Sequence, residues 1–262
     1  TKDDVGGLYT AKVLDQTLYV VGSKLATGTS SKPLDLSSAL LADADGTSWE
    51  PADGYAVKAL LATKTNDVVT GYDVYTKGTN EDDLYVSHFD KGNDGRLILS
   101  TTSPVDAVVL TQLEADTKRD LDGNGIFGVD ITSAIDEKGG LFEAKIPGST
   151  FIMAGDKLVD GTSKATLGLA NALLDSDGNL WQKGELTPLT AVRSKDQSGV
   201  TTVTLYSQIG QDANKIQKAI FRNTANDPKL KLVAAETGEI TANQLASDEA
   251  AAKRDLNKDQ AF

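Results

Sequence analysis

The residues of this chain most able to do chemistry lie in one short stretch, "KRDLDGNGIFGVD", at residues 118–130. Oxygen-bearing side chains alternate there and are followed by Gly125, which permits the sharp turn of a calcium-binding loop. The twelfth position of the loop, where such loops have a bidentate Glu, is Ile131, so we expect either that the preceding Asp130 substitutes or that a carboxylate comes from elsewhere in the chain. Ile126, at position 7 of the loop, would bind through its backbone carbonyl, and the other residues through side-chain oxygens. The predicted calcium ligands are therefore Asp120, Asp122, Asn124, Ile126 and Asp130.

A second stretch, "KRDLNKDQAF" at residues 253–262, has the same spacing and supplies weaker metal candidates, Asp255, Asn257 and Asp259. Gln260 replaces the turn glycine and the sequence ends at Phe262, so this loop is expected to be truncated. The alternative for both stretches is a polar connector without an ion. The recurrence of the pattern favours calcium. Other acidic stretches, at residues 43–46 and 175–178, are interpreted as hairpin turns in which Asp accepts backbone N–H bonds.

The elements that must position these loops come in two copies. "GGLYTAKVLDQTLYVVGSKLATGTS" at residues 6–30 matches "GGLFEAKIPGSTFIMAGDKLVDGTS" at residues 139–163. Further along, Trp49 aligns with Trp181, and these are the only two tryptophans. The two Asp-rich stretches align as well. The sequence therefore indicates a tandem duplication.

Each copy begins with strand-like runs and closes with a helix. In the first copy, alternation of apolar and polar residues predicts strands, separated by Gly- and Asp-containing turns, at residues 17–23, 54–65, 69–76, 83–89 and 95–100. In the first copy Ser103 is expected to cap the helix, with Pro104 at its first position and Asp106 completing a capping box. Thr241 and Gln244 are expected to form the capping box of the second helix.

The expected fold class is thus mainly β with one helix per unit (α+β). It is a tandem duplication of an antiparallel β module followed by a helix and an Asp-rich, calcium-type loop. The expected organisation is a first repeat module at residues 1–119, an inter-module loop at 120–130, a second module at 131–254 and a truncated loop or tail at 255–262.

Composition excludes several classes of function. The net charge of −12 and the scattered Lys and Arg residues disfavour nucleic-acid binding, and no apolar run is long enough for membrane insertion. The absence of cysteine excludes disulfides and thiol chemistry. His88, the only histidine, has no counterpart in the second copy and is interpreted as a sheet-surface residue, which disfavours a histidine-dependent enzyme. Glycoside hydrolysis by paired carboxylates stays open on the sequence, but no enzyme is expected. No basic, apolar leader opens the chain, which indicates a mature form, a fragment, or export without an N-terminal signal.

The single Trp after an Asp-Gly turn, the run "GYDVYTKG" and the segment "LEADTKRDLDGNGIFG" resemble the bacterial tryptophan-rich repeat. That repeat occurs in large exported hemagglutinin-like and RTX-like surface proteins. The resemblance covers nearly the whole chain and implies type I secretion and an extracellular place at the bacterial cell surface. This chain departs from the family pattern by having one Trp per copy, and Asn124 where Asp is commoner.

The expected function is that of a non-catalytic, calcium-stabilised repeat module of a surface-layer or adhesin-type protein. It would act as a monomer or in a lattice, with self-assembly or a surface glycan as its partner. Two alternatives stay open. One is a carbohydrate-binding module in which Trp49 and Trp181 contact the ligand, and the other is an accessory domain of a secreted hydrolase.

Overall fold

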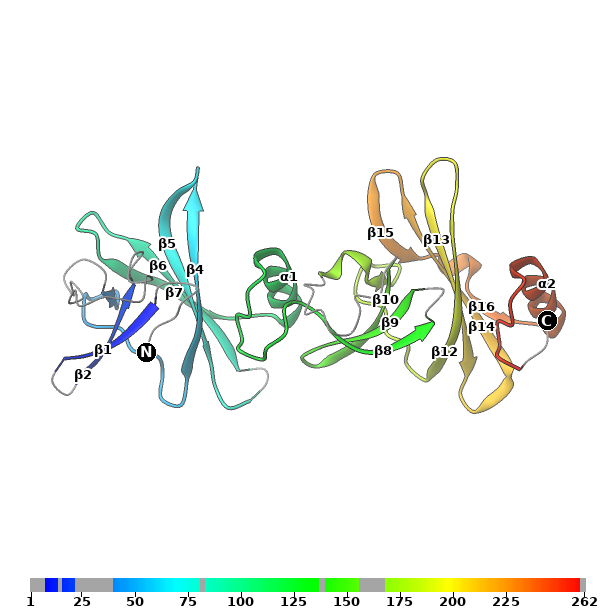
Figure 1. Ribbon diagram of the computed structural model, residues 1–262, viewed down its shortest axis with the longest axis horizontal. Helices are drawn as coiled ribbons and strands as arrows, with labels where there is room; N and C mark the ends of the chain where they lie inside the picture. The colour runs from blue at the N-terminus through cyan, green and yellow to red at the C-terminus, as the bar shows by residue number, and fades with distance from the viewer. Residues whose placement is uncertain are drawn as a thin grey trace, which may run out of the picture. The chain divides into compact units, whose positions relative to one another are not determined.

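The computed structural model describes residues 8–13, 16–21, 40–80, 83–136, 140–155 and 168–259. Within these residues the fold is mainly β, with two α-helices and two curled, mixed sheets that each form half of a barrel (Figure 1). The chain divides into two compact units, residues 1–110 with 119–125 and residues 111–118 with 126–262.

The first unit contains a small hairpin and a five-stranded sheet. The hairpin pairs β1 with β2, and the sheet has the order β3-β7-β6-β5-β4. The two long strands at one edge are joined by Asn66 and Asp67, which both have positive φ, as a two-residue turn with the native strand twist requires. The strands are β1 Leu8–Val13, β2 Gln16–Val21, β3 Leu41–Ala42, β4 Ala56–Thr65, β5 Val68–Lys77, β6 Leu84–Lys91 and β7 Leu97–Pro104. Helix α1, Ala107–Thr117, follows β7, and the division between the two units falls within it, after Leu110.

The second unit contains a three-stranded sheet, β10-β9-β8, and a six-stranded sheet with the order β11-β15-β14-β13-β12, in which β16 also pairs with β14. Two short 3-10 helices, η1 and η2, precede β11 and β16. The elements are β8 Asp130–Asp136, β9 Leu141–Ile146, β10 Ser149–Ala154, η1 Leu169–Asn171, β11 Leu173–Leu174, β12 Leu186–Lys195, β13 Thr201–Ile209, β14 Asp212–Thr224, β15 Asp227–Leu232, η2 Ala234–Glu236, β16 Gly238–Ile240 and α2 Ala242–Ala252.

The two larger sheets have the same strand order and the same irregularity. In each of them the first edge strand shifts register near its start, between Val57 and Ala59 in β4 and between Pro188 and Thr190 in β12, and β4 shifts once more between Thr63 and Lys64. The prediction of purely antiparallel modules was wrong in one respect, because β3 runs parallel to β7 and β11 runs parallel to β15. These strands have two residues each, too few for an alternation pattern to reveal their direction.

Each unit has its own hydrophobic core, with a tryptophan and a phenylalanine at its centre. Trp49 contacts Phe89 edge-to-face with 5.2 Å between ring centroids, and Trp181 contacts Phe221 in the same way at 5.2 Å. Both phenylalanines are fully buried, and the tryptophans are 5% and 8% exposed. Edge-to-face pairs of this kind add to the free energy gained from burial of the rings.

The two helices begin differently from each other. Helix α1 begins at Ala107, and the carboxylate of Asp106 accepts hydrogen bonds from the N–H groups of Val108 and Val109 at 2.8 and 3.2 Å. The prediction that Ser103 caps this helix was wrong, because Ser103 still pairs within β7. In α2 the predicted capping box of Thr241 and Gln244 is confirmed.

Candidate metal centre

The chain leaves α1 through a tight turn that is fastened to the sheet of the first unit. Lys118 follows the helix in the left-handed conformation, with φ of 55°. The guanidinium of Arg119 then donates to the carbonyl oxygen of Leu60 in β4 at 2.7 Å. Leu121, two residues further on, is fully buried. This geometry fixes where the Asp-rich loop begins.

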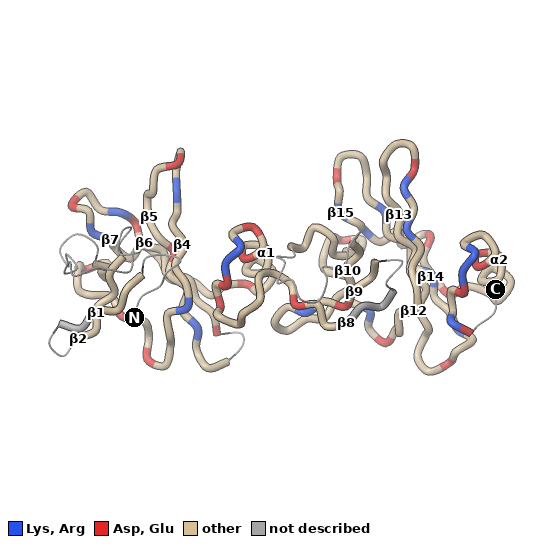
Figure 2. Tube along the Cα trace, viewed as in Figure 1, with Lys and Arg blue, Asp and Glu red and all other residues tan. Residues whose placement is uncertain are grey.

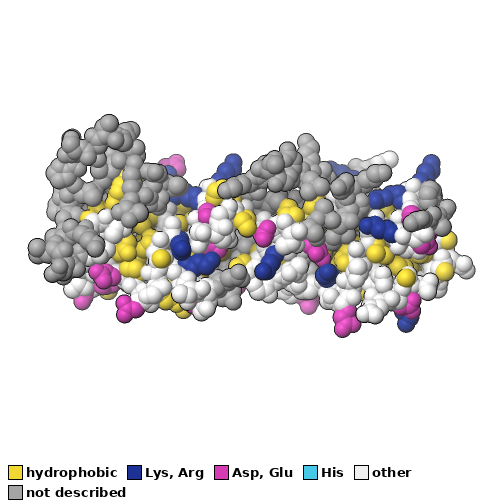
Figure 3. Space-filling model, turned by 60° about the horizontal axis from the view of Figure 1, so that its bottom comes forward, with side chains coloured by type: hydrophobic (Ala, Val, Ile, Leu, Met, Phe, Trp, Pro, Cys, Tyr) yellow, Lys and Arg dark blue, Asp and Glu magenta, His cyan; other side chains and the backbone are white. Residues whose placement is uncertain are grey.

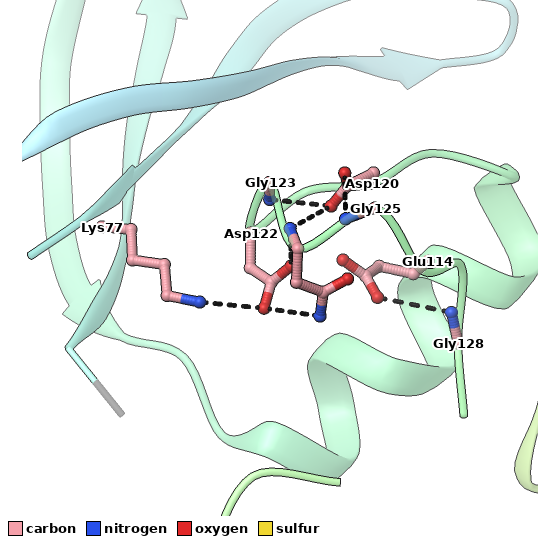
Figure 4. A network of polar contacts seen from close by, with 8 residues as sticks. Lys77, Glu114, Asp120, Asp122, Gly123, Gly125 and Gly128 are labelled. Carbon is pink, nitrogen blue, oxygen red and sulfur yellow. Dashed lines mark hydrogen bonds and ion pairs between the residues drawn. The ribbon is translucent and has the colours of Figure 1, made fainter. Parts of the chain in front are cut away.

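Three carboxylates come together beyond this turn. Glu114 projects from α1, and Asp120 and Asp122 come from the loop, with one oxygen of each lying within 4.8 Å of the others. Figure 4 shows the three side chains pointing toward one another. Glu114 is 2% exposed and Asp122 is 3% exposed. Buried carboxylates are costly unless they are hydrogen-bonded or neutralised, so the group requires compensation.

Backbone N–H groups provide part of that compensation at Asp120. One of its oxygens accepts from the N–H groups of Gly123 at 2.7 Å and Asn124 at 3.0 Å, and the other accepts from Gly125 at 2.8 Å. Gly123 and Gly125 have φ of 75° and 85°, values that glycine adopts without strain. The loop sequence therefore wraps its own backbone around the first carboxylate.

Asp122 is compensated by a cation and an amide. The ammonium of Lys77, at the end of β5, lies 3.2 Å from one carboxylate oxygen. The side-chain amide of Asn124 donates to that same oxygen at 3.0 Å, and the backbone N–H of Asn124 donates to the other oxygen at 3.0 Å. Glu114 in turn accepts from the N–H of Gly128 at 3.3 Å.

The geometry of the three acids fits a hard divalent cation. Two oxygens on opposite sides of a calcium ion, each about 2.4 Å from it, are about 4.8 Å apart. All the pairs of ligand oxygens in this group lie within that separation. Three carboxylates so close together also repel one another. Like charges about 4 Å apart repel by about 4 kcal/mol at an effective dielectric constant of about 20, and a divalent cation would relieve that repulsion.

The structure brings together part of the predicted site. Asp120 and Asp122 belong to the acidic group, and Asn124 holds the Asp122 carboxylate through hydrogen bonds. Ile126 lies half-buried just after the loop. Asp130 is not in the group: it is exposed at the start of β8, with its Cα opposite that of Lys145.

Glu114 supplies the third carboxylate of the group, so it comes from outside the loop, as the second of the two expectations had it, and not from Asp130. Its signal was present in the repeat, because Glu249 precedes the second Asp-rich stretch by the same interval. Both glutamates are buried, at 2% and 5% exposure, although glutamate is rarely buried in proteins. The sequence signal for this ligand was a glutamate that recurs at a fixed distance before both loops.

The second loop repeats the turn but not the acidic group. Lys253 has φ of 51°, and Arg254 donates to the carbonyl of Ala191 in β12 at 2.9 Å, as Arg119 does to Leu60. Leu256 is fully buried and donates its N–H to Glu249 at 3.1 Å. Among the residues that the structure describes here, which end at Asp259, Glu249 belongs to no group of three acidic side chains like the one at the first loop.

The weaker candidates of this loop bond to one another. The N–H of Asp259 donates to side-chain oxygens of Asp255 and Asn257 at 3.2 and 3.1 Å, and the Asn257 amide donates to Asp259 at 2.8 Å. Asn257 stands where the first loop has Asp122, which removes one carboxylate from the set. The predicted residues at 260–262 lie outside the described residues.

The two tryptophans form part of the cores. At 5% and 8% exposure, neither Trp49 nor Trp181 leaves an indole face open for stacking against a sugar. Each ring instead packs edge-to-face on a buried phenylalanine. The reason is the Asp-Gly turn before each tryptophan, which folds the ring back onto the sheet by pairing Trp49 with Leu41 and Trp181 with Leu173 through backbone hydrogen bonds of 3.0 and 2.8 Å.

His88 lies on the sheet surface of β6, between two carboxylates. Its Nδ1 lies 2.6 Å from Asp73 and its Nε2 lies 3.2 Å from Asp90, with the ring 32% exposed. The hydrogen bond to Asp73 raises the pKa of His88, with a smaller contribution from Asp90 against the lowering effect of burial. A Ser-His-Asp triad needs a hydroxyl at the second ring nitrogen, and Asp90 occupies that position here.

The remaining acidic turns behave as hairpin turns. Asp175 accepts the backbone N–H groups of Asp177 and Asn179, both at 2.9 Å, and these bonds hold the pKa of Asp175 below its usual range, with the bond from Asn179 contributing most. In the first unit, Asp45 accepts from the N–H and the hydroxyl of Thr47 at 2.9 and 2.7 Å. The interpretation of these stretches as turns is confirmed.

Charge is spread over the described surface. Figure 2 shows Asp and Glu at several loop and hairpin tips, interspersed with Lys and Arg along the trace. On the face drawn in Figure 3, side chains of both signs lie among apolar ones, and neither sign gathers into one patch. No helix in the described part of the chain has the length and apolar character needed to cross a membrane.

Comparisons of the chain with protein-family models, with curated proteins and with solved structures found no significant match.

Proposed function

We propose that this chain is a non-catalytic, calcium-stabilised repeat module of an exported bacterial cell-surface protein, of the surface-layer or adhesin type. The observation that carries the proposal is the group of Glu114, Asp120 and Asp122, whose oxygens lie within 4.8 Å of one another in a largely buried place. Calcium is the favoured ion because the side chains that converge are all oxygen donors, and softer metals prefer nitrogen or sulfur.

In this proposal Glu114, Asp120 and Asp122 hold the ion, and the ion supplies positive charge that offsets their mutual repulsion. The chain's own contribution is to orient the carboxylates. The backbone of residues 123–125 fixes Asp120, and Lys77 together with Asn124 fixes Asp122. Since the helix and the loop each contribute ligands, ion binding would stabilise the path by which the chain leaves α1.

The cell-surface part of the proposal is supported by the tandem repeat, the acidic and cysteine-free composition and the resemblance to the tryptophan-rich repeat. Calcium is scarce in the cytosol and abundant outside the cell. A module of this kind would therefore gain stability after export, when it meets calcium, with self-assembly or a surface glycan as the candidate partner.

The test is calcium-dependent stability measured with and without the acidic group. The melting temperature of the wild-type chain is expected to rise with calcium and to fall with chelator, and calorimetry should give a saturable heat. Replacing both Asp120 and Asp122 by Asn keeps the side-chain size and should remove the response. Replacing both Asp175 and Asp177 by Asn is the matched control, because it removes the same charge at an exposed turn.

Two results would contradict the proposal. One is a wild-type chain whose melting temperature does not respond to calcium. The other is an Asp120→Asn, Asp122→Asn variant that folds and keeps the full response.

A further inference from the structure

A cavity in the first unit lies apart from the acidic group and differs from it in chemistry. Its volume is about 340 Å³. It opens beside the start of β4, over the paired strands β5, β6 and β7, and its principal lining residues are Trp49, Tyr55, Thr76, Tyr85, Ser87 and Thr102. The volume is at the lower end of the range for small-molecule sites, so it suits one ring rather than an extended ligand.

Aromatic carbon forms one side of this cavity. The rings of Tyr55 and Tyr85 contact each other edge-to-face, with centroids 5.6 Å apart and an angle of 84° between their planes. Both tyrosines are half-buried, whereas Trp49 behind them is 5% exposed. The tyrosines are therefore the aromatic residues that a ligand can reach, each with an apolar ring and a hydroxyl.

Hydroxyl groups form another side. Thr76 and Ser87 are 5% and 2% exposed, and the hydroxyl of Ser87 lies 3.0 Å from that of Thr102. A hydroxyl can donate one hydrogen bond and accept two, so this pair has capacity beyond its mutual bond. The two other residues that line the cavity, Pro51 and Ala52, are apolar, so no charged side chain lines it among the described residues.

One carboxylate lies beside Tyr55. Gly78 separates the two, since a Cβ on Gly78 would lie 3.0 Å from Cβ of Asp83 and 3.1 Å from the Tyr55 ring. Asp83 also contributes to a raised pKa of Tyr55, after the larger effect of burial. The amide of Asn80 donates to Asp83 at 2.8 Å and holds it in place. A negative charge at this position favours neutral ligands with hydroxyl groups and disfavours anions.

The second unit has the same strand order but lacks the two tyrosines and the serine that line this cavity. Strand register places Leu186, Gln217 and Ala219 where the first unit has Tyr55, Tyr85 and Ser87. The core positions, by contrast, keep their aromatic pair in both units. The tyrosines and the serine are thus not required by the fold of the module. They are a feature of the first unit alone.

We propose that this cavity binds one neutral sugar ring, as part of a glycan. A sugar ring presents C–H groups on its faces and hydroxyls at its edge. The C–H face would pack on Tyr55 and Tyr85, and edge hydroxyls would bond to Ser87, Thr102 and the tyrosine hydroxyls. The proposal does not depend on calcium, because none of the lining residues belongs to the acidic group.

The experiment is saturation-transfer NMR on the full chain in the presence of chelator. The probes are glucose, galactose and N-acetylglucosamine as neutral sugars, glucuronate as an acidic sugar, and cyclohexanol as an apolar ring of similar size. At least one neutral sugar is expected to bind in the millimolar range, more tightly than glucuronate and cyclohexanol.

The test variant carries Tyr55→Leu and Tyr85→Gln, which the second unit already accommodates in the same register. It should bind the sugar at least about tenfold more weakly. Tyr72→Leu is the matched control, because Tyr72 is a half-buried tyrosine of the same sheet that does not line the cavity, and it should bind as the wild type does. Melting temperatures establish that both variants fold.

Three results would overturn the proposal: none of the neutral sugars binds, cyclohexanol binds more tightly than all of them, or the Tyr55→Leu, Tyr85→Gln variant binds as the wild type does. Because chelator is present throughout, failure here leaves the calcium proposal untouched, and failure of calcium binding leaves sugar binding to be measured independently.

Discussion

The ammonium of Lys77 lies 3.2 Å from a carboxylate oxygen of Asp122, whose side chain is 3% exposed. Lys77 therefore helps to compensate this buried acid in the calcium-free chain. In the calcium-bound chain the same ammonium would lie close to the ion and repel it. The two roles make opposite predictions for stability and for calcium affinity.

Replacing Lys77 by Met keeps the length of the aliphatic chain and removes the charge. Without calcium, unfolding should become easier by about 1–3 kcal/mol, because Asp122 loses its ion pair. Calcium should bind more tightly, because the ammonium no longer opposes it. Denaturant unfolding in chelator and calorimetry with calcium measure the two effects, and Lys77→Arg is the control that keeps the charge. Weaker calcium binding by Lys77→Met would show that the ion does not lie beside Asp122.

The buried glutamates of the two helices should differ in their response to calcium. Glu114→Gln removes one carboxylate from the acidic group and should weaken calcium binding by about tenfold or more. Glu249→Gln makes the same change beside the second loop, where no such group is found among the described residues, and should leave the calcium affinity unchanged. Calorimetry on both variants makes the comparison. Equal losses in the two variants would contradict the assignment of the site to the first loop.

His88 should titrate above its ordinary range. Its pKa is raised chiefly by the hydrogen bond to Asp73, so the protonated form is the one that the folded chain favours. The resulting stability is fully present below the unfolded pKa of about 6.5, and it is lost as pH rises through the higher folded pKa. His88 is the only histidine, so its NMR signals are unambiguous. Asp73→Asn should bring the pKa back toward its ordinary value, and a wild-type pKa at or below about 6.5 would contradict the pairing.

The start of α1 can be tested by removing the side chains that compete to cap it. Asp106→Ala should destabilise the chain by about 1 kcal/mol, because two N–H groups of the first turn lose their acceptor. Ser103→Ala should change stability by less than about 0.5 kcal/mol, since Ser103 is an exposed residue of β7. Thermal unfolding of both variants decides between the two caps. A larger loss of stability for Ser103→Ala than for Asp106→Ala would show that Ser103 caps the helix.

The sequence allowed most of the fold to be predicted, because its signals are local. Alternation located β2, β4, β5, β6 and β7, and the Thr241–Gln244 capping box located α2. The parallel pairing of β3 with β7 could not be predicted, since it joins two residues to a strand far along the chain. The start of α1 was missed because Pro104 fits both the end of a strand and the first turn of a helix.

The loop residues of the acidic group could be predicted from the sequence, whereas its helix residue could not. Asp120 and Asp122 follow from spacing alone, because a loop ligand set is contiguous in sequence. Glu114 lies one helical turn before the loop, and only the three-dimensional path of the chain brings its carboxylate beside Asp122. The cavity at Tyr55 and Tyr85 was also beyond the sequence, since its walls come from four separate segments.

The parallel pairing of the shortest strands has a consequence for how each unit folds. Leu41 joins the sheet through Leu97, and Leu173 through Leu230, so the opening segment of each sheet enters it only after the later strand has formed. Pairings between such distant parts of a chain slow folding. During synthesis, the opening segment of each sheet would stay unpaired with its parallel partner until β7 or β15 had emerged from the ribosome, so this part of each sheet would close late.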